Sequence, residues 1–330
     1  MSTETPPQPA VPSPGVVVAE VVRSGFVEGR HHGSLVALGP GGEPDWAVGD
    51  AVSPVLPRSC NKPLQATAMV RLGLDLPPDL LALASASHSG EPFHVEGVRR
   101  ILAIAGLDAS SLRTPPDWPI DVEARDDVVR AGGERSSLLM NCSGKHAAML
   151  LTCVVNGWST TDYLDPGHPL QQAVTATFAE LTGEPVAALA VDGCGAPLHG
   201  TSLTGLARAF GRIASAGDGA EARVADAVRA HPAYVSGTRR DERDLLRAVP
   251  GAVGKAGAEA CYAVGLPDGS AVALKIHDGG TRARAVVMAA ALERSGVLER
   301  EGVDADAVRR TGRLELTGGD AVVGEVRAAF

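Results

Sequence analysis

The sequence predicts an α+β fold whose central antiparallel sheet takes strands from both ends of the chain and is flanked by helices. Strand-like, β-branched runs lie near both termini of the 330 residues, and helical patterns fill the middle. The regular strand–helix alternation of a doubly wound parallel sheet is missing. The chain is 45% hydrophobic, enough for a large core, and contains no internal repeat or linker. We therefore expect residues 16–330 to form one domain.

Composition excludes several classes of protein. The net charge of −9 argues against nucleic-acid binding, and an aromatic content of 3% leaves few side chains on which bases could stack. No apolar run reaches the length of a membrane span. Residues 1–15 are rich in proline, which predicts a disordered tail, and they lack a secretory signal. Five widely spaced cysteines, an odd number, predict free thiols in a cytoplasmic protein.

The N-terminal third is expected to open with a hairpin and to continue into helices. β-branched residues and a Gly-rich turn predict the hairpin, and apolar residues three and four apart predict the helices. Pro63 fits the first turn of its helix, where a missing N–H costs little. The expected strands are residues 16–23, 33–38 and 46–52, and the expected helices are residues 63–72 and 93–105.

The rest of the chain is expected to run through helices and then to return to the sheet. Apolar runs of helical length predict helices over residues 145–156, 168–181, 220–230, 242–248 and 288–295. Shorter runs predict strands over residues 187–191, 260–264, 271–276, 284–287 and 314–316. Most of these strands lie in the last third, so the C-terminal part of the chain is expected to complete the sheet.

The segment R-S-C-N-K-P (58–63) places Ser59 and Lys62 on one face of a helical turn. A neutral lysine amine there can accept the serine proton, which a serine nucleophile needs because its alcohol reacts poorly at neutral pH. Burial or a second cation would favour the neutral amine. The alternative is a serine that caps a helix beside a solvated lysine. The S-x-x-K spacing alone does not decide between these interpretations.

Two later segments extend this pattern. The sequence S-H-S (87–89) follows an apolar run, and K-A-G (255–257) precedes a strand. Their order after S-x-x-K is that of serine β-lactamases and penicillin-binding proteins, although neither segment matches fully. The pattern offers two pairs around one carbonyl, Ser59–Lys62 and Ser87–Lys255. The alternatives are a helix cap for Ser87 and a surface loop for Lys255.

Cys142 and Cys194 each lie in a Gly-containing loop beside an apolar element. Two thiolates, one nitrogen and a water would complete a tetrahedral Zn²⁺ site. The nitrogen could come from His146 or Lys145, of which histidine is the ordinary choice, and Asp192 could orient a ligand. Two buried structural thiols are the alternative interpretation.

Other polar residues are candidates for contact with a substrate. Arg58 adjoins Ser59, His88 lies between two serines as a candidate relay, and Asp192 precedes Cys194. Lys275 or Arg282 is expected near a substrate carboxylate. We expect the substrate to be bound by Arg58, His88, Asp192 and Lys275. No phosphate-binding glycine motif is found in the sequence.

These residues together resemble the type II asparaginase family, in its zinc-containing, β-lactamase-like form. The resemblance covers nearly everything after residue 16. It is carried by eight ordered segments, R-S-G-F-V-E-G-R-H-H-G (23–33), R-S-C-N-K-P (58–63), A-S-H-S-G-E (86–91), N-C-S-G-K-H-A (141–147), D-P-G-H-P-L-Q (165–171), D-G-C-G-A-P (192–197), K-A-G-A-E (255–259) and L-K-I-H-D-G (274–279).

The resemblance implies an amidohydrolase that acts on L-asparagine, with a β-lactamase-like fold and a homodimeric assembly. It implies that Ser59 is the nucleophile with Lys62 as its base, and that Ser87 and Lys255 form a second pair. It also implies that Zn²⁺ is held by the set Cys142, Lys145 and Cys194, which favours Lys145 over His146 as the nitrogen ligand.

Three departures from the family pattern concern the surroundings of the site. The family's K-T-G is K-A-G here, a usual glycine is Ala260, and a C-G-x-H segment before a tryptophan is replaced by T-P-P-D-W (114–118).

Two other functions stay open. One is a Ser–Lys amidase for glutamine, a β-lactam or a peptide amide. The other is a non-catalytic, zinc-stabilised binding protein.

Overall fold

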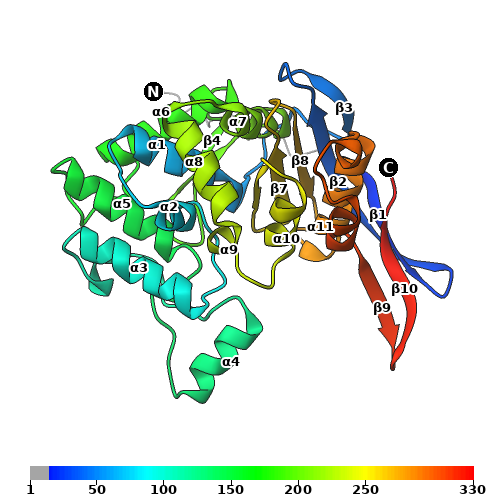
Figure 1. Cartoon of the computed structure of the whole chain (residues 1–330), viewed down its shortest axis with the longest axis horizontal. Helices are drawn as coiled ribbons and strands as arrows, with labels where there is room; N and C mark the ends of the chain where they lie inside the picture. Colours follow the sequence, from blue (N-terminus) through cyan, green and yellow to red (C-terminus); the bar gives the residue numbers. More distant parts are fainter. Residues whose placement is uncertain (1–14) are drawn as a thin grey trace, which may run out of the picture.

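The computed structural model describes residues 15–330 and confirms the α+β architecture with strands from both termini (Figure 1). All neighbouring strands of the main sheet are antiparallel, in the order β6-β7-β8-β2-β1-β10-β9, and β3 pairs with β2. The strands are β1 (Val16–Arg23), β2 (Phe26–Leu38), β3 (Pro44–Val48), β6 (Val253–Ala256), β7 (Cys261–Gly265), β8 (Ala271–Ile276), β9 (Leu314–Gly318) and β10 (Ala321–Ala328).

Helices fill the middle of the chain, as expected, and gather beside the sheet (Figure 1). A short hairpin of β4 (Ala188–Val191) and β5 (Pro197–Gly200) lies among them. The helices are α1 (Lys62–Arg71), α2 (Pro78–Ala84), α3 (Pro92–Ile104), α4 (Val122–Arg130), α5 (Ser143–Val155), α6 (Pro169–Thr182), α7 (Leu203–Ser215), α8 (Gly219–Ala230), α9 (Pro232–Val235), α10 (Asp241–Ala248), α11 (Arg284–Arg294) and α12 (Ala305–Thr311).

The two faces of the sheet carry different helices. A Cβ on Gly265 of β7 would lie 2.1 Å from the backbone oxygen of Phe210, so the missing side chain lets α7 approach that face closely. Tyr262, three positions earlier and therefore on the opposite face, lies under the guanidinium of Arg284 at the start of α11, 5.6 Å away. Lys255 pairs with Ala263 across the strands and shares the α7 face with Gly265.

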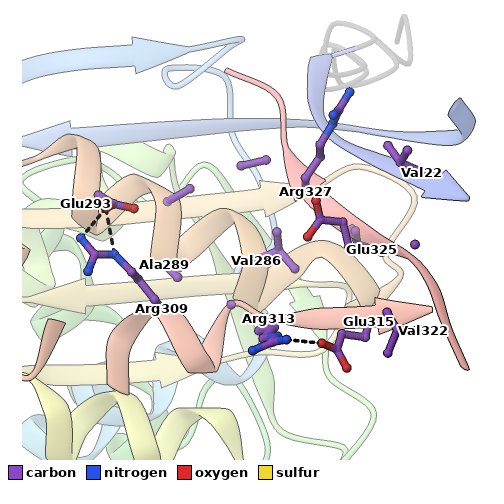
Figure 2. A pocket seen from close by; sticks show the side chains of 15 residues that line it. Val22, Val286, Ala289, Glu293, Arg309, Arg313, Glu315, Val322, Glu325 and Arg327 are labelled. Atoms are coloured by element: carbon purple, nitrogen blue, oxygen red, sulfur yellow. Dashed lines mark hydrogen bonds and ion pairs between the residues drawn. The ribbon is translucent and has the colours of Figure 1, made fainter. Parts of the chain in front are cut away.

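The α11 face carries an open groove of about 660 Å³ beside the C-terminal hairpin (Figure 2). Val286 and Ala289 of α11 form part of its lining, and Arg309 of α12 binds Glu293 at 2.8 Å. The groove therefore lies on the other side of the sheet from Lys255.

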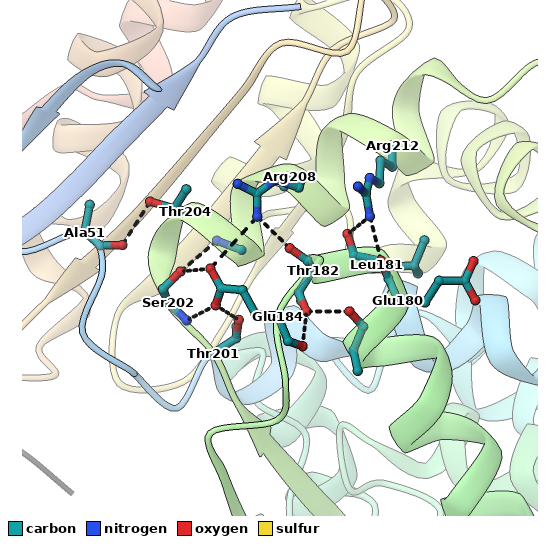
Figure 3. Close-up of polar contacts among 12 residues, drawn as sticks. Ala51, Glu180, Leu181, Thr182, Glu184, Thr201, Ser202, Thr204, Arg208 and Arg212 are labelled. Carbon is teal, nitrogen blue, oxygen red and sulfur yellow. Dashed lines mark hydrogen bonds and ion pairs between the residues drawn. The ribbon is translucent and has the colours of Figure 1, made fainter. Parts of the chain in front are cut away.

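A partly buried polar network surrounds the start of α7 (Figure 3). Ser202 accepts the backbone N–H of Gly205 at 2.8 Å and donates its own hydroxyl to Glu184 at 2.6 Å. Glu184 also accepts the Thr201 hydroxyl at 2.9 Å. Ser202 thereby caps a free backbone N–H at the start of α7, and Glu184 joins that start to the segment after α6.

Several sequence predictions are corrected by the structure. Residues 284–287 were expected as a strand, but they form the first turn of α11, because the run continues through alanines that pack along one helical face. The strands β5, β6 and β10 and the helices α4, α7, α9 and α12 were not predicted. The expected tail lies outside the described residues except for Gly15. The single-domain assignment stays a prediction.

Candidate active site

Ser59 and Lys62 lie where a short 3₁₀ helix (Arg58–Asn61) runs directly into α1. Lys62 is the first residue of α1, and Pro63 occupies the first turn as expected. Ser59 is 8% exposed, whereas Lys62 is 1% exposed. Both residues are therefore buried, and Ser59 keeps slightly more contact with solvent than Lys62 does.

The buried Lys62 amine contacts the loop after α2. Its Nζ lies 2.9 Å from Ser87 Oγ and also donates to the backbone oxygen of Ala86. Among residues 15–330, no hydrogen bond joins Ser59 to Lys62 or Ser87 to Lys255. The structure thus brings Lys62 and Ser87 together, which is a different pairing from the two predicted ones.

His88 is fully buried, and both of its ring nitrogens have partners. Nδ1 accepts the backbone N–H of Gly90 at 3.1 Å, which leaves Nε2 to donate to Ser143 Oγ at 2.8 Å. Burial lowers the pKa of His88 well below its usual range, so the ring is neutral. Neither nitrogen is free for a substrate, and His88 instead ties the Ser87 loop to the start of α5.

Lys255 lies at the end of β6 and is paired with a residue that the sequence did not single out. Its Nζ donates to Glu242 Oε1 and to the Ala256 oxygen, both at 2.7 Å. Lys255 and Glu242 have no exposed side-chain surface. Burial lowers the pKa of Lys255, and Glu242 opposes that effect. Glu242 lies in a charged helical segment, D-E-R-D (241–244), whose pattern gives no sign that one carboxylate is buried.

An ion pair lies directly beside Ser59. Arg58 Nε lies 2.7 Å from Asp192 Oδ1, and a second nitrogen of Arg58 lies 3.7 Å from Glu259. Lys275 donates to the backbone oxygen of Glu259. Arg58 therefore lies between Asp192 and Glu259, and Lys275 contacts the backbone of Glu259, so contacts connect three of the predicted substrate-binding residues.

The backbone beside this ion pair is strained. Arg58, Glu259 and Ala260 have φ angles of 52°, 55° and 50°, in the left-handed region that disfavours residues with a Cβ. Such conformations persist only where surrounding contacts enforce them, and they are concentrated at functional sites.

Cys142, Lys145 and Cys194 form a second buried cluster. Lys145 Nζ lies 3.2 Å from Cys194 Sγ, and Met140 and Ala196 pack around the two thiols. A hydrogen bond from Cys142, aided by the charge of Lys145, holds the pKa of Cys194 well below its usual range. Burial lowers the pKa of the Lys145 amine, but the nearby sulfur atoms of Cys194 and Cys142 outweigh burial. The pKa of Lys145 therefore lies above its ordinary value.

The donors of this cluster fit a zinc ion only if the lysine is one of them. No three His, Cys, Asp or Glu side chains in the described part of the chain could together hold a metal. His146 turns Nδ1 to the Tyr163 hydroxyl at 2.8 Å. Two thiols and one amine are buried together, and sulfur and nitrogen are the donors that Zn²⁺ prefers. Cys142, Lys145 and Cys194 could therefore bind zinc.

Comparison with known proteins identifies the family. The model of the L-asparaginase II family matches residues 19–328, and the chain belongs to that family. Its members are amidohydrolases, so the chain is assigned to this class of enzyme. None of the curated proteins compared with the chain matches it.

Several solved structures resemble the chain at low identity. One is a β-lactamase from Mycobacterium bovis, with 16% identity and a TM-score of 0.44, covering 79% of this chain and 94% of that one. Another is EstCE1, a hydrolase with promiscuous acyltransferase activity, with 11% identity, a TM-score of 0.38 and coverages of 91% and 94%. A third is Mglu in its native form in 4.3 M NaCl, with 13% identity, a TM-score of 0.38 and coverages of 87% and 66%. Scores this low carry no argument about activity or substrate.

Proposed function

We propose that the protein is an L-asparaginase, which hydrolyses the side-chain amide of L-asparagine to L-aspartate and ammonia. One observation carries the proposal. The chain belongs to the L-asparaginase II family, and the buried amine of Lys62 is hydrogen-bonded to Ser87. Lys62 also follows Ser59 in the sequence by about one helical turn. A buried amine that contacts a neutral hydroxyl is suited to exchange protons with serine.

The proposed reaction is a double displacement. Ser59 Oγ passes its proton to the neutral Lys62 amine and attacks the side-chain carbonyl carbon of asparagine. The C–N bond breaks, and ammonia leaves with a proton returned by Lys62. A β-aspartyl ester then remains on Ser59 until water cleaves it, which frees aspartate and restores the hydroxyl. Backbone N–H groups at the start of α1 stabilise the oxyanion.

The other residues bind and orient the substrate in this proposal. Arg58 and Lys275 offer positive charge to the substrate carboxylate, and Asp192 offers negative charge to its ammonium group. Ser87 holds the Lys62 amine in place through their hydrogen bond. His88 acts as a support for the Ser87 loop, because both of its nitrogens are engaged within the protein.

Zinc has a supporting part in the proposal. Cys142, Lys145 and Cys194 hold the ion, and Asp192 lies nearby, with its Oδ2 atom 3.8 Å from Cys194 Sγ. When bound, Zn²⁺ supplies a cross-link between the start of α5 and the β4–β5 hairpin and a positive charge beside the substrate site. The covalent chemistry stays with the serine and lysine residues.

The test is ammonia release by the purified, zinc-loaded protein with L-asparagine and with L-glutamine. We expect release from asparagine and its loss in Ser59→Ala, and mass spectrometry of the quenched enzyme should find the acyl group on the Ser59 peptide. Release from another amide alone would favour the alternative amidase. An acyl group on Ser87 would reverse the order of the two serines. No ammonia release from any amide by the folded, zinc-loaded wild type would favour the non-catalytic binding protein.

The homodimer and the cytoplasmic location also stay predictions. Light scattering coupled to size-exclusion chromatography tests the first, and cell fractionation tests the second. None of the helices in residues 15–330 combines the length and apolar character needed to span a membrane.

A further inference from the structure

Lys255 has a different kind of partner from Lys62, although both amines are buried. Lys62 contacts a hydroxyl and a backbone carbonyl, both neutral groups. Lys255 contacts the carboxylate of Glu242 at 2.7 Å, and neither side chain of that pair is exposed. A carboxylate at this distance favours the protonated form of a lysine, and removing it would leave a buried charge without a counter-charge.

Glu242 also fixes the position of the strand that carries Lys255. Its Oε1 atom accepts the backbone N–H of Ala256 at 3.0 Å as well as the Lys255 amine. The Lys255 backbone oxygen in turn accepts the thiol of Cys60 at 3.0 Å, and Cys60 follows Ser59 directly. One buried carboxylate therefore links α10, the end of β6 and the short helix that carries Ser59.

We propose that Glu242 is a positioning residue that holds Lys255 as a fixed ammonium, so that Lys62 is the lysine that accepts the serine proton. Lys255, the lysine of the second predicted pair, then contributes a positive charge to the site and does not act as a base. The inference rests on the proposed Ser–Lys chemistry for its effect on activity, but the charge state of Lys255 is independent of it.

Other charged groups act on the same pair. Burial lowers the pKa of Lys255, and the positive charges of Lys62 and Arg240 act in the same direction, whereas Glu242 raises it. The titratable or charged groups that face Lys255 and Glu242 are Cys60, Lys62, Arg240, Asp241, Tyr262 and Arg284. Those that face Lys62 from the other elements are His88, Cys142 and His146. Among the groups that face Lys255, Glu242 is the one whose carboxylate touches its amine.

The direct test measures the protonation of Lys255 by NMR of ¹³C-lysine-labelled, substrate-free protein, with Lys255→Met to assign the signal. We expect Lys255 to be protonated at neutral pH in the wild type, because the Glu242 carboxylate touches its amine. In Glu242→Gln it should lose its proton at a lower pH than in the wild type. Asp244→Asn is the matched control, because it removes a half-exposed carboxylate from the same helix. A neutral Lys255 in the wild type at pH 7, or an unchanged titration in Glu242→Gln, would overturn the inference.

Activity gives a second readout. If Lys255 loses its proton within the assayed range in Glu242→Gln, the pH profile of ammonia release should change shape at the pH of that titration, and the profile of Asp244→Asn should match that of the wild type. A uniform loss at all pH values would indicate a merely structural role and would contradict the inference. If Glu242→Gln does not fold, Glu242→Asp replaces it, with an expected Lys255 titration midpoint below that of the wild type. Absence of ammonia release by the wild type would refute the proposed function, while the NMR titration would still decide the charge of Lys255.

Discussion

Lys62 and Lys145 are both buried lysines in the first turn of a helix, but their partners differ in charge. Lys62 contacts a serine hydroxyl and a backbone carbonyl, whereas Lys145 contacts the thiol sulfur of Cys194, with Cys142 and Asp192 close by. Neutral partners leave an amine free to gain and lose a proton. Anionic sulfur holds the amine as a cation, or yields it to a metal that displaces the proton. The same side chain is therefore suited to catalysis in one place and to zinc in the other.

The two regions are joined by one ion pair. Arg58 directly precedes Ser59, and Asp192 lies two residues before Cys194, so their 2.7 Å contact links the serine to the thiol cluster. A substrate bound at this ion pair would lie beside both regions. Mutations of Lys62 and of Lys145 should show whether the catalytic role and the metal-binding role can be separated.

The largest expected effect is on the Lys62 side. Lys62→Met should lower kcat for ammonia release by about 10²–10⁴-fold, because general-base help is lost, and should leave the zinc content unchanged. Lys62→Arg should be equally inactive, because a guanidinium does not give up its proton. Steady-state assays and metal analysis of the same samples check both variants. Full activity in Lys62→Arg would contradict a neutral base at this position.

The next effect should be found on the Lys145 side. Lys145→Met or treatment with a chelator should reduce bound zinc and lower Tm by about 5 °C or more, because the buried thiols lose their cross-link. Metal analysis and calorimetry with and without added Zn²⁺ measure this. Cys153→Ala is the control, because that thiol lies in the apolar core and away from the cluster. A zinc content that is unchanged in Lys145→Met would exclude the lysine as a ligand.

A pH effect on stability should come from His94, beside the His88 ring. His94 stacks on His88 at 5.2 Å, and burial, partly opposed by a hydrogen bond to Ala233, lowers the pKa of His94 to about 4. The unfolded chain takes up this proton near pH 6.5, so the contribution of His94 is complete above that pH and is lost as the pH falls toward 4.

The slope that His94 contributes is at most about 1.4 kcal/mol per pH unit. Urea unfolding at several pH values in this window should show a flatter dependence for His94→Gln than for the wild type. His32→Gln, at an exposed histidine, serves as the control. An equal slope in the wild type and in His94→Gln would contradict the assignment.

The smallest expected effect concerns the strained turn at Glu259 and Ala260. Ala260 is buried with a φ of 50°, where the family pattern has glycine. Ala260→Gly should stabilise the protein by about 0.5–1 kcal/mol, because relief of the left-handed strain exceeds the entropy that glycine adds to the unfolded chain. Ala256→Gly, in the neighbouring strand, should destabilise it. Denaturant titrations compare the two, and a less stable Ala260→Gly would contradict the strain argument.

Local patterns predicted much of the fold. Residues 271–276 form the predicted strand, and the helices expected over residues 63–72 and 145–156 are found within two residues of those limits. In these segments local preference and burial agree. The strand expected over residues 284–287 was wrong because two adjacent valines favour a strand locally, and the helix is set by packing over a longer run.

The sequence by itself predicted which residues carry the chemistry: two serines, three lysines and two cysteines in ordered motifs. Motifs specify residue types because a proton acceptor or a metal ligand must have a particular functional group. Only the tertiary structure decided which groups touch. It pairs Lys62 with Ser87, Lys255 with Glu242 and Lys145 with Cys194, across sequence separations of 25, 13 and 49 residues. Such contacts depend on how the helices and the sheet pack, and a buried partner such as Glu242 has no local signature.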